Sequence, residues 1–98
     1  MVTAYNYLWF IKWSNEAQKR AAKDPELFTK WMEKHHKHCE NSGVKLVFAG
    51  TPYTTVEESV FCYETEMPLA EFQAFKQGLY NLDRTIIDYA KTITVVPY

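Results

Sequence analysis

Glycine and cysteine are scarce in this sequence, and it has no excess of basic residues. These shortages limit the classes of function that the chain can have. Three glycines leave no Gly-rich loop of the kind that cradles the phosphates of a nucleotide. The 11 basic residues are balanced by 12 acidic ones, for a formal net charge of -1. Nucleic acids and anionic membranes both attract a basic excess. We therefore expect no nucleic-acid partner, no membrane partner and no cofactor.

Long apolar runs are also missing. No run approaches the length of a membrane span, and the opening residues, MVTAYNYLWFIKW, lack the basic start and small-residue cleavage site of a signal peptide. The two cysteines, Cys39 and Cys62, are then expected to be reduced thiols in a cytoplasmic protein. The length of 98 residues suits one domain, residues 1–98.

Aromatic residues, by contrast, are abundant and pattern the chain. They make up 16% of it, within a hydrophobic share of 47%, which is enough apolar surface for a folded core. Residues 4–13 alternate as a strand, and both of its faces are largely apolar. Such a strand is expected to be central in its sheet and covered on both sides.

The remaining elements follow from helix and strand signals. Asp24 and Pro25 are typical of a helix start, and Gly43 is typical of the residue after a helix end. Pro68 opens a second helix with apolar residues at helical spacing. The full prediction is a strand at 4–13, a possible short helical turn within 14–26, a helix at 24–42, strands at 44–51 and 59–65, a helix from 68, a short helix at 82–91 and a strand at 92–98.

This order is β-α-β-β-α-β, which predicts the ferredoxin-like class of α+β folds. A four-stranded antiparallel sheet then carries two helices on one face, and its other face is bare. In this chain the bare face is apolar, and an exposed apolar surface of that size usually marks an interface. We therefore predict a homodimer in which two sheets face each other.

The pattern resembles the dimeric α+β-barrel superfamily over nearly the whole chain. The stretch SGVKLVFAGTP, residues 42–52, is similar to the helix end, strand and turn of YCII-related proteins. The superfamily includes small monooxygenases, haem-degrading enzymes and isomerase-like proteins. The resemblance implies a sheet-to-sheet dimer and leaves open a cofactor-free monooxygenase-like or isomerase-like enzyme.

All three histidines lie in one stretch, EKHHKHCE, residues 33–40. At 100° per residue, His35 lies in the middle of an apolar helical stripe with Trp31 and Cys39, and His38 lies at its edge. Zinc held by His35, Cys39 and His38 is one interpretation. A core helix with one buried, hydrogen-bonded histidine is favoured over it, so no metal site is predicted.

A buried imidazole needs a hydrogen-bond partner, and Asn6, Tyr63 or a thiol are the candidates. We name His35 and Asn6 as candidate catalytic residues, and Trp31, Tyr63 and Cys39 as candidate ligand-binding residues. The first hypothesis is a protein that binds a small, largely apolar molecule between helix and sheet. The alternative is a non-catalytic assembly or accessory protein whose core is filled.

Overall fold

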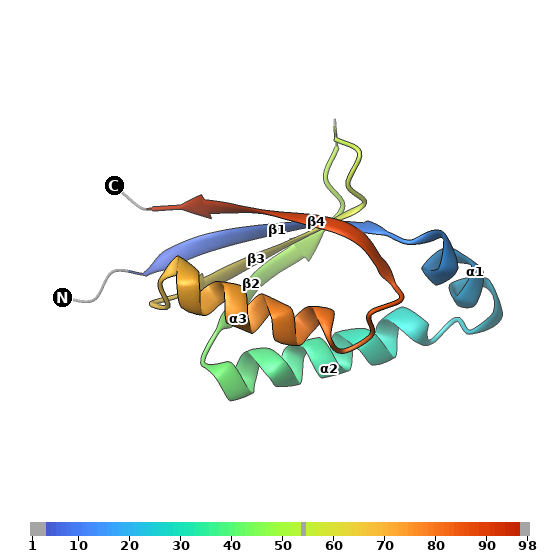
Figure 1. Ribbon diagram of the computed structural model, residues 1–98, viewed down its shortest axis with the longest axis horizontal. Helices are drawn as coiled ribbons and strands as arrows, with labels where there is room; N and C mark the ends of the chain where they lie inside the picture. Colours follow the sequence, from blue (N-terminus) through green and yellow to red (C-terminus); the bar gives the residue numbers. More distant parts are fainter. Residues whose placement is uncertain (1–3, 54, 97–98) are drawn as a thin grey trace.

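The computed structural model describes residues 4–53 and 55–96. In this part of the chain, one antiparallel sheet has the strand order β2-β3-β1-β4. Helices α2 and α3 lie on one face of the sheet, and α1 lies beyond one end of it (Figure 1). The elements are β1 (Tyr5–Trp13), α1 (Asn15–Lys23), α2 (Leu27–Ser42), β2 (Lys45–Gly50), β3 (Ser59–Thr65), α3 (Leu69–Tyr80) and β4 (Ile87–Val95).

Strand β1 occupies the inside of the sheet, between β3 and β4, as its two apolar faces predict. Tyr7, Trp9 and Ile11 are buried on the face toward the helices, and Tyr7 stacks on Phe72 of α3 with ring centroids 3.9 Å apart. The alternate residues point to the opposite, outer face.

Helix α2 ends where the sequence predicts and begins slightly later. Gly43 takes a left-handed φ of 69°, and this conformation costs glycine nothing because it has no Cβ. At the start, the helix begins at Leu27 rather than at Pro25. Asp24 lies in the preceding turn, where its Oδ1 accepts a hydrogen bond from the N–H of Glu26 at 3.1 Å.

Two predictions about the elements need correction. The structure has three helices in the described residues rather than two, because residues 15–23 form a full helix capped by Ser14, whose Oγ accepts from the N–H of Ala17. The short helix predicted at 82–91 is wrong: β4 begins at Ile87 and pairs with β1 along its length. Long-range pairing overrides local preference there. Residues 97–98 of the predicted last strand lie outside the described residues.

Helices α2 and α3 approach closely at Gly78. An added Cβ at Gly78 would lie 2.6 Å from the imidazole of His38. That ring stacks on Phe75 with centroids 4.8 Å apart, and its Nε2–H donates to the Phe75 carbonyl at 3.0 Å. Gly78 therefore makes room for a histidine that joins the two helices.

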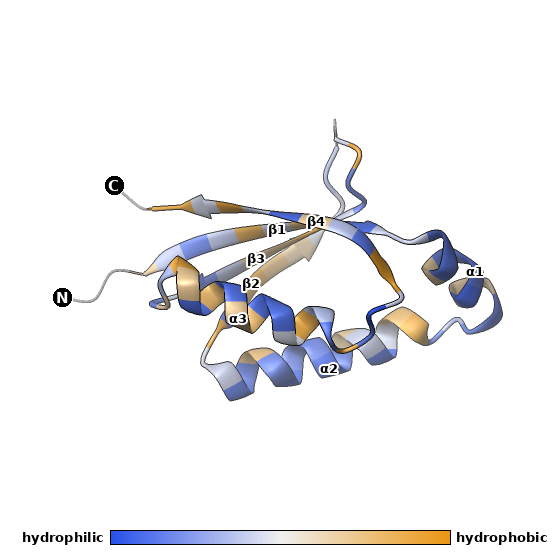
Figure 2. Cartoon of the chain, in the orientation of Figure 1, coloured by the Kyte–Doolittle hydropathy of each residue, from blue (hydrophilic) through white to orange (hydrophobic). Residues whose placement is uncertain are grey.

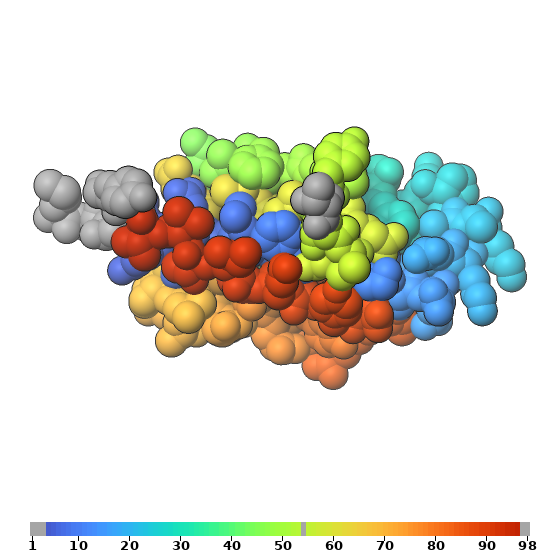
Figure 3. Space-filling model, turned by 90° about the horizontal axis from the view of Figure 1, so that it is seen from above, coloured from blue at the N-terminus to red at the C-terminus, as the bar shows by residue number. Residues whose placement is uncertain are grey.

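The outer face of the sheet is only partly covered. Residues 51–53 and 55–58, in the link from β2 to β3, rise from this face and lie over part of it (Figures 1 and 3). Beyond them, Phe48, Ile93 and Val95 are 52%, 44% and 43% exposed. The C-terminal end of β4 is accordingly apolar in Figure 2. None of the helices in the described residues is long and apolar enough to cross a membrane.

Candidate functional site

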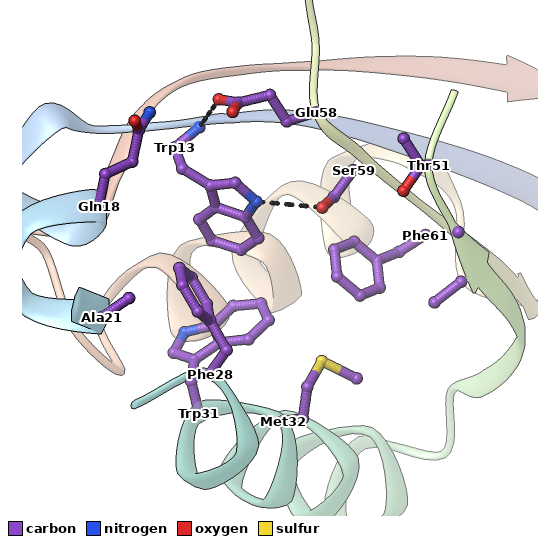
Figure 4. Close-up of a pocket in the computed structure, with 12 residues that line it drawn as sticks. Trp13, Gln18, Ala21, Phe28, Trp31, Met32, Thr51, Glu58, Ser59 and Phe61 are labelled. Atoms are coloured by element: carbon purple, nitrogen blue, oxygen red, sulfur yellow. Dashed lines mark hydrogen bonds between the residues drawn. The ribbon is translucent and has the colours of Figure 1, made fainter. Parts of the chain in front are cut away.

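A cleft of about 720 Å³ lies between α2 and the β2–β3 side of the sheet. Figure 4 shows its walls: α2 contributes the floor, β1 and β3 the roof, and the end of β2 one side. Its lining is mostly apolar. The lining residues are Trp13, Gln18, Ala21, Phe28, Trp31, Met32, Ala49, Gly50, Thr51, Glu58, Ser59 and Phe61.

Aromatic rings build the inner wall of the cleft. Trp13, the last residue of β1, packs edge to face on Trp31, with centroids 5.6 Å apart and planes at 86°. It also packs on Phe28, with centroids 4.9 Å apart. Phe61 closes the wall from β3, 5.9 Å from Trp31 between centroids. These contacts fix the rings in place, so the wall is formed before any ligand arrives.

The polar groups of the cleft gather beside Trp13. Its indole Nε1–H donates to the Ser59 hydroxyl at 3.0 Å, and its backbone N–H donates to Glu58 Oε1 at 3.1 Å. Both interactions are drawn in Figure 4. Glu58 also lies 3.7 Å from the Lys12 ammonium. Glu58 is the single charged residue in the lining, so the cleft offers no cation to an anionic ligand.

An ion pair between a buried carboxylate and a half-exposed ammonium holds the loop that carries Glu58. The carboxylate of the preceding residue, Glu57, is only 2% exposed and lies 2.6 Å from the Lys91 ammonium on β4. Thr55 donates to the same carboxylate at 2.7 Å. Hydrogen bonds from Lys91 and Thr55 lower the pKa of Glu57 to about 2. Glu57 is therefore a buried, ionised carboxylate that fastens the loop to β4.

His35 lies deeper than the cleft. It is fully buried, and its Nε2 shares a hydrogen bond with the Tyr63 hydroxyl at 2.7 Å, as the sequence allowed. Its ring packs edge to face on Trp31 and Phe61, 4.8 Å from each centroid. Burial lowers the pKa of His35 to about 4, and His36 and His38 add to this effect. The imidazole is thus neutral at pH 7.

Two buried polar atoms have no partner within the described residues: Nδ1 of His35 and Nε1 of Trp31. Each belongs to a side chain wedged between α2 and the sheet. An unpaired buried polar group costs on the order of 1–3 kcal/mol. Trp31 joins the cleft to the buried surroundings of His35, because it contacts His35 and also lines the cleft.

The other candidate residues lie apart from the cleft. Cys39 is buried one turn beyond His35, and burial raises the pKa of its thiol to about 11, which removes nucleophilic thiolate at pH 7. Asn6 alternates with Tyr7 and pairs across the sheet with Glu64, so it lies on the outer face and cannot assist His35. No group of three potential metal ligands occurs in the parts of the chain that the structure describes.

Of the five candidate residues, the structure brings His35, Tyr63 and Trp31 together and separates Asn6 from them. Only Trp31 lines the cleft. Sequence reasoning missed the polar pair formed by Trp13 and Ser59. The α2 side of the cleft could have been predicted from the sequence, since Phe28, Trp31 and Met32 share one side of a helix at positions i, i+3 and i+4.

No known protein family matches this chain, and no curated protein matches its sequence. The resemblance of residues 42–52 to YCII-related proteins therefore stays an expectation. The cleft is the feature from which a function can be inferred.

Proposed function

We propose that this protein binds a small, flat and mainly apolar molecule in the cleft between α2 and the sheet. The observation that carries the proposal is a cleft of about 720 Å³ walled by Trp13, Phe28, Trp31 and Phe61. Small-molecule sites commonly enclose 300–1,000 Å³ and combine apolar walls with a few placed polar groups. Filling this cleft would remove the exposed aromatic edges from water, which is favourable.

The chemistry of the lining favours binding over reaction. His35, the residue with the most perturbed environment on α2, is enclosed by Trp31, Phe61 and Tyr63 and does not line the cleft. The carboxylate of Glu58 already accepts the Trp13 backbone N–H. A binding role therefore needs no group beyond those in place, whereas an enzyme of the monooxygenase-like or isomerase-like kind would need a proton-transfer group at the ligand.

A blocking variant tests the cleft directly. Ala49 is an exposed residue of β2 that lines the cleft, so Ala49→Trp should fill the space without disturbing the core. We expect it to abolish the rise in melting temperature that an aromatic ligand such as 1-tetralone gives with the wild type. Ala22→Trp, at an exposed position of α1 outside the lining, is the matched control and should keep the rise. A wild type with no rise would refute the proposal.

We further propose that the chain is a ferredoxin-like protomer that dimerises through its outer sheet face. The strand order β2-β3-β1-β4, with α2 and α3 on one side, supports this arrangement. Phe48, Ile93 and Val95 supply an exposed apolar surface beside the loop. Tyr53 and Val56, 86% and 69% exposed on the loop above the same face, extend it. Exposed apolar residues gathered on one face of a sheet are typical of an interface.

Neighbouring residues of β4 provide a matched test of the dimer. Ile93 pairs with Leu8 on the outer face, and Thr94 pairs with Tyr7 on the helix-facing side; both are exposed. We expect Ile93→Lys to give a monomer in light scattering at micromolar concentration, because burying an unpaired ammonium is costly. Thr94→Lys should remain dimeric. A wild type that is monomeric at these concentrations would contradict the proposal.

A further inference from the structure

The Ser59 hydroxyl has a free proton at the edge of the cleft. Its oxygen accepts the indole N–H of Trp13 at 3.0 Å. A serine hydroxyl also carries one donor hydrogen, and no acceptor for it is found among residues 4–53 and 55–96. Figure 4 shows Ser59 between Trp13 and Phe61, facing the space that the aromatic rings enclose.

We infer that the ligand carries a neutral carbonyl-type oxygen, which accepts a hydrogen bond from the Ser59 hydroxyl while its rings pack on the aromatic wall. This inference rests on the proposed function and specifies the chemical class of the ligand: a two- or three-ring aromatic ketone, lactone or similar carbonyl compound. The Trp13 indole occupies one acceptor position of the hydroxyl and leaves its proton available to the ligand.

The charges of the lining residues favour a ligand whose hydrogen-bond acceptor is neutral. Glu58 is the one charged side chain among the described lining residues, and its carboxylate is paired with Lys12 at 3.7 Å. This paired carboxylate offers no attraction to a carboxylate or phosphate on the ligand. Arg and Lys side chains, which bind such anions, are missing from the lining residues. A neutral carbonyl oxygen needs only the one donor that Ser59 supplies.

Two probes of the same shape isolate the carbonyl: 1-tetralone, and tetralin, its hydrocarbon counterpart. Dissociation constants for both are measured with the wild type, Ser59→Ala and Ser59→Thr. A neutral hydrogen bond corresponds to about a 2- to 10-fold change in affinity. We expect Ser59→Ala to lower the affinity for 1-tetralone by this factor and to leave the affinity for tetralin unchanged. Ser59→Thr, which keeps a hydroxyl, should bind 1-tetralone as the wild type does.

A double variant separates the two possible donors. Ser59→Ala frees the Trp13 indole N–H, which then has no acceptor in place of Ser59. Trp13→Phe combined with Ser59→Ala removes both donors, and the ratio of the two probe affinities should match that of Ser59→Ala alone. A carbonyl-specific loss that appears only in the double variant would mean that the freed Trp13 indole donates to the ligand, and would overturn Ser59 as the required donor.

The remaining outcomes distinguish this inference from the proposed function. If Ser59→Ala and the double variant both change the two probe affinities equally, or both leave them unchanged, the cleft binds apolar molecules and the carbonyl inference fails. If 1-naphthoate binds more tightly than 1-tetralone, the ligand is an anion and the inference also fails. If the wild type binds none of the three probes, the proposed function itself fails.

Discussion

The buried, neutral state of His35 predicts a large dependence of stability on pH. His35 has no exposed surface, and burial holds its folded-state pKa near 4, against 6.5 for an ordinary histidine. A difference of about 2.5 pKa units at 1.36 kcal/mol per unit corresponds to about 3 kcal/mol. The side chains around it add no compensating charge, because burial raises the pKa of both Tyr63 and Cys39 and keeps them neutral.

The direction of this pH dependence follows from proton binding. Between pH 6.5 and about 4 the unfolded chain binds a proton at His35 and the folded chain does not, so the free energy of unfolding rises with pH in this window. The contribution is complete above pH 6.5, and it is lost progressively as the pH falls to 4. We expect the free energy of urea unfolding of the wild type to be about 2–3 kcal/mol larger at pH 7.5 than at pH 4.5 from this residue alone, because pH 4.5 is still above the folded-state pKa.

The His35→Gln variant isolates the effect from other titrating groups. Glutamine does not titrate, so the wild-type minus variant difference in unfolding free energy should fall by about 2–3 kcal/mol between pH 7.5 and 4.5, at one fixed protein concentration. His36→Gln, one residue away and exposed, is the control and should keep most of the wild-type pH dependence, because burial is the larger cause of the lowered His35 pKa and His36 the smaller. Parallel curves for the wild type and His35→Gln would refute a buried neutral imidazole.

Two further predictions concern the packing of α2. Gly78→Ala should destabilise the protein by about 1 kcal/mol, although alanine is the better helix former by about that amount, because the new Cβ would displace His38 from its stack and hydrogen bond with Phe75. In a His38→Ala background the same substitution should become stabilising; stabilisation in both backgrounds would disprove the contact. Tyr63→Phe should cost about 1–3 kcal/mol in urea unfolding by leaving His35 Nε2 unpaired, and no loss would mean that another group replaces the hydroxyl.

Most of the fold could be predicted because its signals are local. The alternation of residues 4–13 gives a strand with two apolar faces, and its central place in the sheet follows from that. Gly43 marks the end of α2 because its φ of 69° suits a residue without a Cβ. The start of β4 could not be predicted in this way, because residues 87–91 become a strand through pairing with β1.

The candidate site was predicted less completely, for a related reason. Helical periodicity places His35 and Trp31 toward the sheet, and the need of a buried imidazole for a partner points to Tyr63. Helical periodicity shows toward which side a residue points but not how deeply its side chain is buried. It therefore cannot show that Trp31 borders a cleft while His35 lies behind it. The anchoring of Glu57 by Lys91 joins two strands that are far apart in the sequence, and the sequence carries no local sign of it.

The three tryptophans allow the most direct test of ligand binding in the cleft. Trp13 and Trp31 line the cleft, and Trp9 does not. Each indole N–H gives its own resonance in a ¹H–¹⁵N spectrum, so titration with 1-tetralone reports the place of binding. Binding in the cleft predicts that the Trp13 and Trp31 resonances shift together with one dissociation constant while Trp9 stays fixed. A shift of Trp9 alone, or no shift at saturating ligand, would contradict it.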